Sequence, residues 1–168
     1  MRGMPTEPVR VHRSGFLRAE PSSFLGRADE LDRVQSLTGR ASLFVTEEEG
    51  ALCGVLAFVL LSGEGLRAVY QGGFDACAPS ARHLACPGEN IHAFYGWGVA
   101  ATTKTSARRV VDGARGVMAG AVGPLPKFAR PTTEAGHRLM RERLGFVDLP
   151  GSDSGLVWQA PLDAAVAA

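Results

Sequence analysis

The sequence predicts one α/β domain in which helices flank a mixed, mainly antiparallel sheet. Its length of 168 residues suits a single domain. Apolar runs of strand character alternate with segments of helical periodicity. The composition, 45% hydrophobic and 21% charged, is that of a folded protein with enough chain to build a core. We therefore expect residues 1–168 to form one domain, with a frayed tail at 163–168.

Charge, cysteine usage and hydropathy exclude several classes of function. The net charge of +1 creates no global field that would attract nucleic acid or a membrane. The three cysteines, Cys53, Cys77 and Cys86, are odd in number and form no C-x-x-C, so neither a disulfide framework nor a zinc site is indicated. The first residues lack the apolar stretch of a secretory signal, and the longest apolar run, Val55–Leu61, is too short to span a bilayer. We expect a cytoplasmic protein without metal, nucleic-acid or membrane partners.

The first predicted helix begins near residue 22 and runs to about Leu37. Ser22 or Ser23 can cap its start, and Gly39 lies just past its end. Apolar residues recur at helical spacing along one face. They are Phe24, Ala28, Leu31 and Val34.

A strand hairpin is predicted next. Ser42–Thr46 and Ala51–Leu61 have strand character, and the acidic turn Glu47–Gly50 joins them. After a Gly-rich break we expect another short strand at Leu66–Tyr70. Residues 71–90 then form a long irregular segment, and loops of that length are usually functional or mobile.

The segment from Phe94 to Arg109 carries the main functional signal, and its Lys104, Arg108 and Arg109 add charge that could hold an anion. Ile91–Ala101 reads as a strand, and a turn rich in Thr, Lys and Ser follows at Thr102–Ser106. A helix is predicted over Ala107–Met118. Backbone N–H groups at a helix start favour an anion. The sequence therefore predicts a phosphate site here, against the alternative of an ordinary polar helix start.

Strand alternation divides the side chains of Ile91–Ala101 between two faces. One face is predicted to carry His92, Phe94, Gly96 and Gly98, and the other Ile91, Ala93, Tyr95, Trp97 and Val99. The glycines weaken a strand unless something approaches its backbone closely.

The last third of the chain predicts strand, helix and hairpin. Leu125–Ala129 is a short strand, and Thr132 or Thr133 caps a helix that runs to about Leu144. Gly145 ends that helix. Phe146–Leu149 and Gly155–Ala160 are expected to pair as a closing hairpin.

The stretch from Lys127 to Phe146, KFARPTTEAGHRLMRERLGF, resembles the GNAT acyltransferase superfamily. The resemblance is carried by Arg130-Pro131, Thr133, Arg138-Leu139-Met140 and Gly145-Phe146. It implies a sheet splayed between its fourth and fifth strands, here Ile91–Ala101 and Leu125–Ala129, with an acyl-CoA such as acetyl-CoA inserted between them.

The resemblance also implies which residues hold the cofactor. The family's Gln/Arg-x-x-Gly-x-Gly/Ala pattern places Lys104 at its first position, Ala107 at the first Gly and Arg109 at the last, where a long side chain departs from the pattern. The backbone around Gly98 and Val99 would hold the pantetheine arm and polarise the thioester carbonyl. The complete expected set is Trp97, Gly98, Val99, Ala100, Ala101, Lys104, Thr105, Ser106, Ala107, Arg108 and Arg109.

Proton transfer is the less defined part of the resemblance. Many members carry a Tyr four residues before the Gly-Phe pair, where this chain has Arg141. Tyr95, His92 and Glu89 are the candidates for acid and base by position. The alternative for Tyr95 and His92 is that each is a packed core residue.

The resulting hypothesis is an acyl-CoA-dependent N-acyltransferase that transfers acetyl from acetyl-CoA to an amine on a small molecule or peptide. One alternative is an inactive GNAT-fold protein that binds CoA or regulates a partner. Another is an acyl synthase that takes its acyl group from acyl carrier protein. A homodimer is compatible with each of the three.

Overall fold

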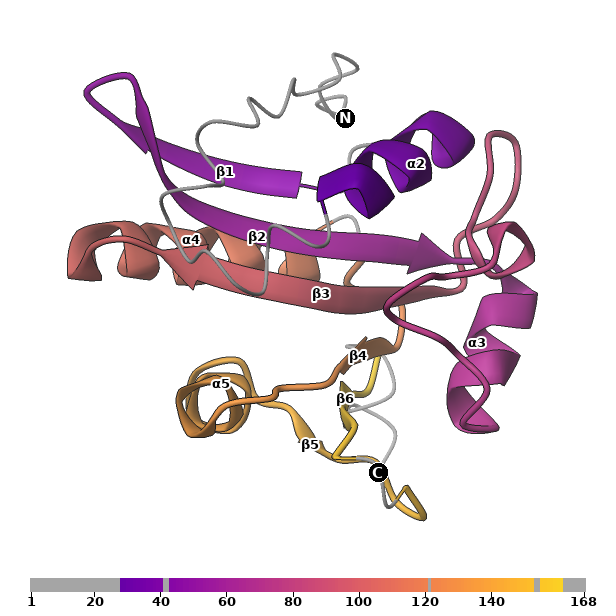
Figure 1. The fold of residues 1–168 in the computed structure, drawn as a ribbon. Helices are drawn as coiled ribbons and strands as arrows, with labels where there is room; N and C mark the ends of the chain where they lie inside the picture. Colours follow the sequence, from indigo (N-terminus) through magenta and orange to yellow (C-terminus); the bar gives the residue numbers. More distant parts are fainter. Residues whose placement is uncertain (1–27, 41–42, 121, 153–154, 162–168) are drawn as a thin grey trace.

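The computed structural model describes residues 28–40, 43–120, 122–152 and 155–161 (Figure 1). The predicted caps Ser22 and Ser23, with Phe24, and the tail at 163–168 lie outside the described residues. The helical elements are α2 (Ala28–Thr38), α3 (Gly63–Tyr70), the 3₁₀ turn η2 (Ala81–His83), α4 (Lys104–Ala119), α5 (Glu134–Arg138) and the π-helical turn η3 (Leu139–Arg143). The strands are β1 (Leu43–Glu48), β2 (Ala51–Leu61), β3 (Ala93–Ala101), β4 (Lys127–Ala129), β5 (Val147–Asp148) and β6 (Val157–Gln159).

The described strands form one sheet in the order β1-β2-β3-β4-β6-β5. Each neighbouring pair is antiparallel except β3 and β4, which are parallel. A parallel neighbour requires a crossover, and α4 provides it. The predicted fold class, a mixed and mainly antiparallel sheet flanked by helices, is confirmed.

Helices cover both faces of the sheet (Figure 1). Val110, Ala114 and Met118 of α4 pack into the cluster on one face, which we call the α4 face. Leu31 and Val34 of α2 pack into the cluster on the other face, the α2 face, to which α3 also contributes. Burial on both sides explains why β2 is one continuous apolar run rather than an alternating one.

A bulge in β3 changes which residues share a face. Ala57 pairs with Gly98 and Phe58 with Gly96, so Trp97 is the extra residue. The extra residue reverses the alternation beyond it. Val99 therefore packs on the α4 face, while Trp97 packs on the α2 face. The predicted placement of Val99 beside Trp97 is wrong for this reason.

Ile91 is a second misplaced side chain on this segment. Strand alternation predicted that Ile91 and Ala93 share a face. Ile91 instead precedes β3 and packs on the α4 face, whereas Ala93 packs on the α2 face. The period-two rule holds only within the strand itself.

The predicted strand Leu66–Tyr70 is wrong, because these residues belong to helix α3. Ser62 caps that helix by accepting a hydrogen bond from the Gly65 amide at 3.1 Å. Gly65 also permits a close contact, since an added Cβ would lie 2.1 Å from the His83 carbonyl oxygen. The helix therefore packs directly on the backbone of η2.

The C-terminal elements begin and end close to their predicted positions. Thr133 caps α5 by accepting from the Gly136 amide at 3.1 Å, which settles the choice between the two threonines. Gly145 ends the helical segment with a φ of +73°, a conformation that glycine adopts without steric cost. The closing hairpin is confirmed as β5 and β6, each shorter than predicted.

No helix of the described residues is long and apolar enough to cross a membrane.

Candidate functional site

The parallel seam between β3 and β4 is short. It comprises the pairs Phe94↔Lys127, Tyr95↔Phe128 and Gly96↔Ala129. β3 continues for five residues past Gly96 while β4 ends, and the two chains diverge there (Figure 1). Within the described part of the chain, β3 pairs with no strand on that side beyond Gly96. This is the opening that the sequence led us to expect between these two strands.

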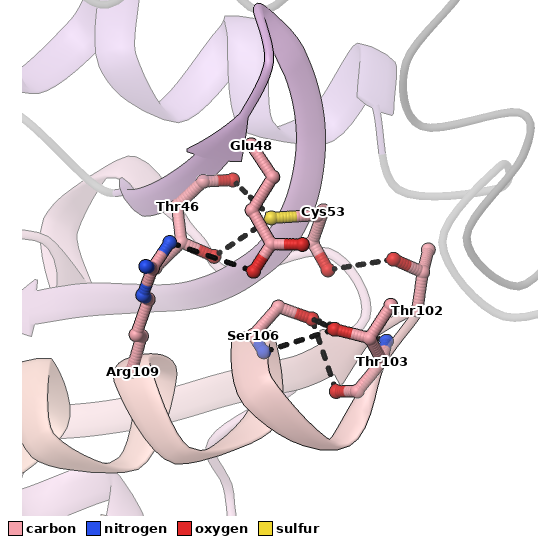
Figure 2. Close-up of polar contacts among 7 residues, drawn as sticks. All are labelled: Thr46, Glu48, Cys53, Thr102, Thr103, Ser106 and Arg109. Atoms are coloured by element: carbon pink, nitrogen blue, oxygen red, sulfur yellow. Dashed lines mark hydrogen bonds and ion pairs between the residues drawn. The ribbon is translucent and has the colours of Figure 1, made fainter.

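α4 begins directly after the free end of β3. Thr103 is its N-cap, so the helix starts three residues earlier than predicted. Thr103 Oγ1 accepts from the Ser106 amide at 3.0 Å, and Ser106 Oγ accepts from the Thr103 amide at 3.1 Å (Figure 2). Ser106 is fully buried. Its predicted contact with a cofactor therefore cannot involve the side chain, which caps the helix instead.

The helix start leaves two backbone donors for a ligand. The Ser106 and Ala107 amides bond to the side chain and the carbonyl of Thr103. The amides of Lys104 and Thr105 precede them and have no acceptor within the helix. These two N–H groups point out of the positive end of α4, which suits an anion.

The basic side chains of this turn have different surroundings. Arg109, the departure from the family pattern, has Nη1 3.4 Å from Glu48 Oε1 at the end of β1 (Figure 2). Lys104 and Arg108 are exposed. The first turn holds no acidic residue to complement the helix dipole. Lys104 and Arg108 therefore remain the residues of this turn best suited to hold a phosphate.

Close packing fixes the helix start against the sheet. A Cβ added at Gly54 of β2 would lie 2.5 Å from both Thr46 Oγ1 and Val110 Cγ2, so only glycine allows this approach. The Thr102 amide donates to the Cys53 carbonyl at 2.8 Å. Thr102 Oγ1 donates to the same oxygen at 3.2 Å (Figure 2). These contacts hold the turn in place before any ligand binds.

The predicted strand residues differ in their accessibility. Trp97 is 8% exposed, and its indole N–H donates to the Ala76 carbonyl, so it anchors the connection between β2 and β3. Gly98, Val99, Ala100 and Ala101 are half-buried. These four residues, which pair with β2 on one side, are the more accessible part of β3.

Tyr95 is a core residue that also borders a pocket. It is 3% exposed, and its ring lies 4.9 Å from that of Phe74. The pocket has a volume of about 410 Å³ and lies on the α2 face. A catalytic role for Tyr95 stays a prediction.

His92 and Glu89 lie far from the start of α4. Both are exposed. His92 and Gly98 are six positions apart in extended chain, which corresponds to about 20 Å. Glu89 Oε2 accepts from the Cys86 amide at 2.9 Å and so stabilises its own turn. The structure therefore does not bring these two candidates together with the expected cofactor residues.

The structure also places two basic residues of the family-like C-terminal segment, Arg130 and Arg141. Arg130 follows β4 immediately and lines the pocket beside Tyr95. Arg141, which stands where the family has its Tyr, has Nη2 2.6 Å from Asp148 Oδ1 on β5. Arg130 was part of the family motif, and the structure places it at the end of β4, where it lines the pocket.

Known structures offer a limited comparison. No protein-family model and no curated protein matches the sequence. Similar solved structures include AtaTR bound with acetyl-CoA, which is 16% identical, with a TM-score of 0.48, over 90% of this chain and 89% of that chain. AtaT complexed with acetyl-methionyl-tRNAfMet is 15% identical, with a TM-score of 0.43, over 74% of each chain. At these values, a proposal of function has to rest on the geometry of this chain.

Proposed function

We propose that the protein is an acyl-CoA-dependent N-acyltransferase that transfers acetyl from acetyl-CoA to an amine. The observation that carries the proposal is the C-terminal part of β3, which contains the bulge, is unpaired on the β4 side and leads directly into the start of α4. Strand backbone for an extended arm and helix amides for a phosphate are thus adjacent in one continuous segment. This combination matches a ligand that joins a pyrophosphate to an amide-containing arm.

Each part of the segment has a distinct task in this proposal. The Lys104 and Thr105 amides, with the Lys104 and Arg108 side chains, bind the pyrophosphate. The backbone of Gly98 and Val99 binds the arm and donates to the thioester carbonyl as charge develops on it. Acetyl-CoA, when bound, supplies the activated acyl group, and it would lie along the edge of β3 that β4 leaves unpaired beyond Gly96.

The proposal requires no dedicated acid at Arg141. The guanidinium pairs with Asp148 and is not a proton donor near neutral pH. A thiol has a pKa of about 8.5, so a thiolate leaves far more readily than an alkoxide and can take its proton from water. The amine is the attacking group and loses its proton to water.

A second candidate is a protein that binds CoA without transferring an acyl group. The Arg141–Asp148 pair favours it, because the position where the family has Tyr holds no acid. The acceptor is proposed only as an amine. The AtaT complex contains an acetylated methionyl-tRNA, so the exclusion of nucleic acid inferred from net charge is not part of the proposal.

Calorimetric titration of the full chain with acetyl-CoA tests the binding step. We expect saturable binding that weakens by roughly tenfold or more in Lys104→Ala or Arg108→Ala, because charge-assisted hydrogen bonds contribute about 1.5–3 kcal/mol. Arg67→Ala on α3, a helix on the α2 face, is the matched control and should bind normally. Absence of binding at millimolar acetyl-CoA would refute the proposal.

Release of free CoA in the presence of amines then separates transfer from binding alone. Release that depends on the amine supports the transferase, and tight binding without release supports the second candidate. Preference for an acyl group carried by acyl carrier protein would identify the synthase alternative.

A further inference from the structure

The pocket on the α2 face lies where β3 and β4 separate. Tyr95 belongs to the second of the three seam pairs, and Arg130 follows Ala129, the last paired residue of β4. Tyr70 and Phe74 line the pocket from α3 and the loop after it, and the turn after Leu149 closes another side. The pocket therefore adjoins the opening through which the proposed thioester would be reached, from the face opposite α4.

The lining of this pocket combines aromatic and aliphatic side chains with polar groups and one positive charge. Tyr70, Phe74 and Tyr95 contribute rings, and Val69, Leu149 and Leu156 are aliphatic. Among the described lining residues Arg130 is the one charged side chain, and no Asp or Glu occurs there.

Arg130 itself is exposed. None of the ion pairs found among the described residues involves it. A guanidinium at the edge of a pocket lined by rings favours a planar anion, which it can bind through two parallel hydrogen bonds.

We propose that this pocket binds the acceptor, and that the acceptor is a small amine bearing both a carboxylate and an apolar side chain, as in an apolar α-amino acid. This inference rests on the proposed N-acyltransferase function and deepens it. The volume of about 410 Å³ lies within the range of small-molecule sites. Arg130 binds the carboxylate, and the rings of Tyr70 and Phe74 contact the side chain.

The same lining prepares the amine for reaction. Arg130 pairs with the acceptor's own carboxylate and so offsets the negative charge that favours the ammonium form, and the lining adds no Asp or Glu, so the amine is held closer to its neutral, nucleophilic form. Its nitrogen forms a bond to the acetyl carbonyl carbon, and the bond from that carbon to sulfur breaks. The CoA thiolate leaves with the electron pair, and the proton lost by nitrogen passes to water.

Acceptor selectivity tests the carboxylate requirement. With acetyl-CoA, L-phenylalanine should react with a kcat/KM at least tenfold above that of L-phenylalaninamide, which lacks the carboxylate. The phosphonate analogue of phenylalanine distinguishes a carboxylate site from a general anion site, and should react less well than the amino acid. Acetylated products are identified by mass spectrometry.

Variants at Arg130 assign the effect to this residue. Arg130→Gln should abolish the preference by lowering kcat/KM for L-phenylalanine about tenfold or more, with little change for the amide. Arg130→Lys should restore part of it. Arg82→Gln, a change of an exposed arginine outside this pocket, is the matched control and should keep the preference.

A binding measurement keeps the test independent of catalysis. N-acetyl-L-phenylalanine, the product, should bind to the wild-type protein. Its affinity for the Arg130→Gln variant should be at least tenfold lower, whether or not acetyl-CoA is present. The inference would be overturned if the wild type and Arg130→Gln bound the product equally, or if the amino acid and its amide reacted at equal rates. It would also be overturned if aminoacyl-tRNA or peptides were acetylated and free amino acids were not. If acetyl-CoA binds but no amino acid is acetylated, the pocket inference fails while the acyl-CoA site stands.

Discussion

Gly113 and Gly116 lie one turn apart on α4, and the structure predicts opposite effects for the same substitution. A Cβ added at Gly113 would lie 2.2 Å from Cζ of Phe44 on β1, whereas one added at Gly116 would meet nothing within 4 Å. Alanine is favoured over glycine in a helix by about 0.8–1.0 kcal/mol. Gly116→Ala should therefore raise the free energy of unfolding by about that amount.

Gly113→Ala gains the same helix propensity but must displace the Phe44 ring or the helix. Overpacking of this kind costs about 1–3 kcal/mol. Because the propensity gain is common to both variants, their difference isolates the packing cost, and we expect Gly113→Ala to be less stable than Gly116→Ala by about 1–3 kcal/mol.

Urea unfolding followed by circular dichroism measures this difference, with equal m-values required of both variants. In thermal unfolding it corresponds to roughly 2–4 °C per kcal/mol for a domain of this size. Phe44→Leu should reduce the cost when combined with Gly113→Ala, because it removes the ring that the new methyl meets. Stabilities within about 0.5 kcal/mol of each other would refute the reasoning, since such a gap is within ordinary non-additivity.

Three other substitutions test separate features of the structure. Thr133→Ala should lower the free energy of unfolding by about 1 kcal/mol, because Thr133 Oγ1 accepts from the Gly136 amide; unchanged stability would show that the cap contributes nothing. Lys127 is fully buried, and desolvation lowers its pKa from 10.5 while Nζ donates to the Gly123 and Leu125 carbonyls. Between the folded and unfolded pKa the unfolded chain binds more protons, so this residue makes stability rise with pH, by at most about 1.4 kcal/mol per unit. Lys127→Met should lose that alkaline rise, whereas Lys104→Met at an exposed site should keep it. Tyr95→Phe should retain acetyl-CoA affinity and turnover, because its ring packs in the core; a hundredfold loss of turnover would make Tyr95 the general acid instead.

Local signals in the sequence account for the elements that were predicted well. The continuous apolar run of β2 reflects burial on two faces, which residue type alone reveals. Gly39 and Gly145 both have positive φ, as expected of glycines just past helix ends. Thr133 caps α5 because a hydroxyl precedes Glu134 in the first turn. The fold class follows from these local features in chain order.

Other features depend on contacts that the sequence does not display. Five residues of α3 fit a strand as well as a helix, and the Ser62 cap together with the contact between Gly65 and His83 decides between them. The start of α4 was placed too late because Thr103 and Ser106 form a capping box in which Ser takes the place of the usual Glu or Gln.

The candidate site was predicted only in part for the same reason. The turn after β3 is local and was found from its residue types. The bulge at Trp97 is visible only through pairing with β2. The pocket beside Arg130 combines α3, β3 and the turn after Leu149, which are distant in sequence. Spatial assembly of this kind leaves no periodic signal in the chain.

The three-residue seam between β3 and β4 has a consequence for hydrogen exchange. β4, β6 and β5 pair with the rest of the described sheet only through this seam, while their side chains also pack in both core clusters. We therefore expect the described C-terminal strands to open as a unit more readily than β1 to β3. Amides of Phe128 and its neighbours should then exchange through a sub-global opening of lower free energy than amides in the middle of β2. A ligand that bonds to both diverging strands would close that route, and slower exchange across the seam would report its arrival.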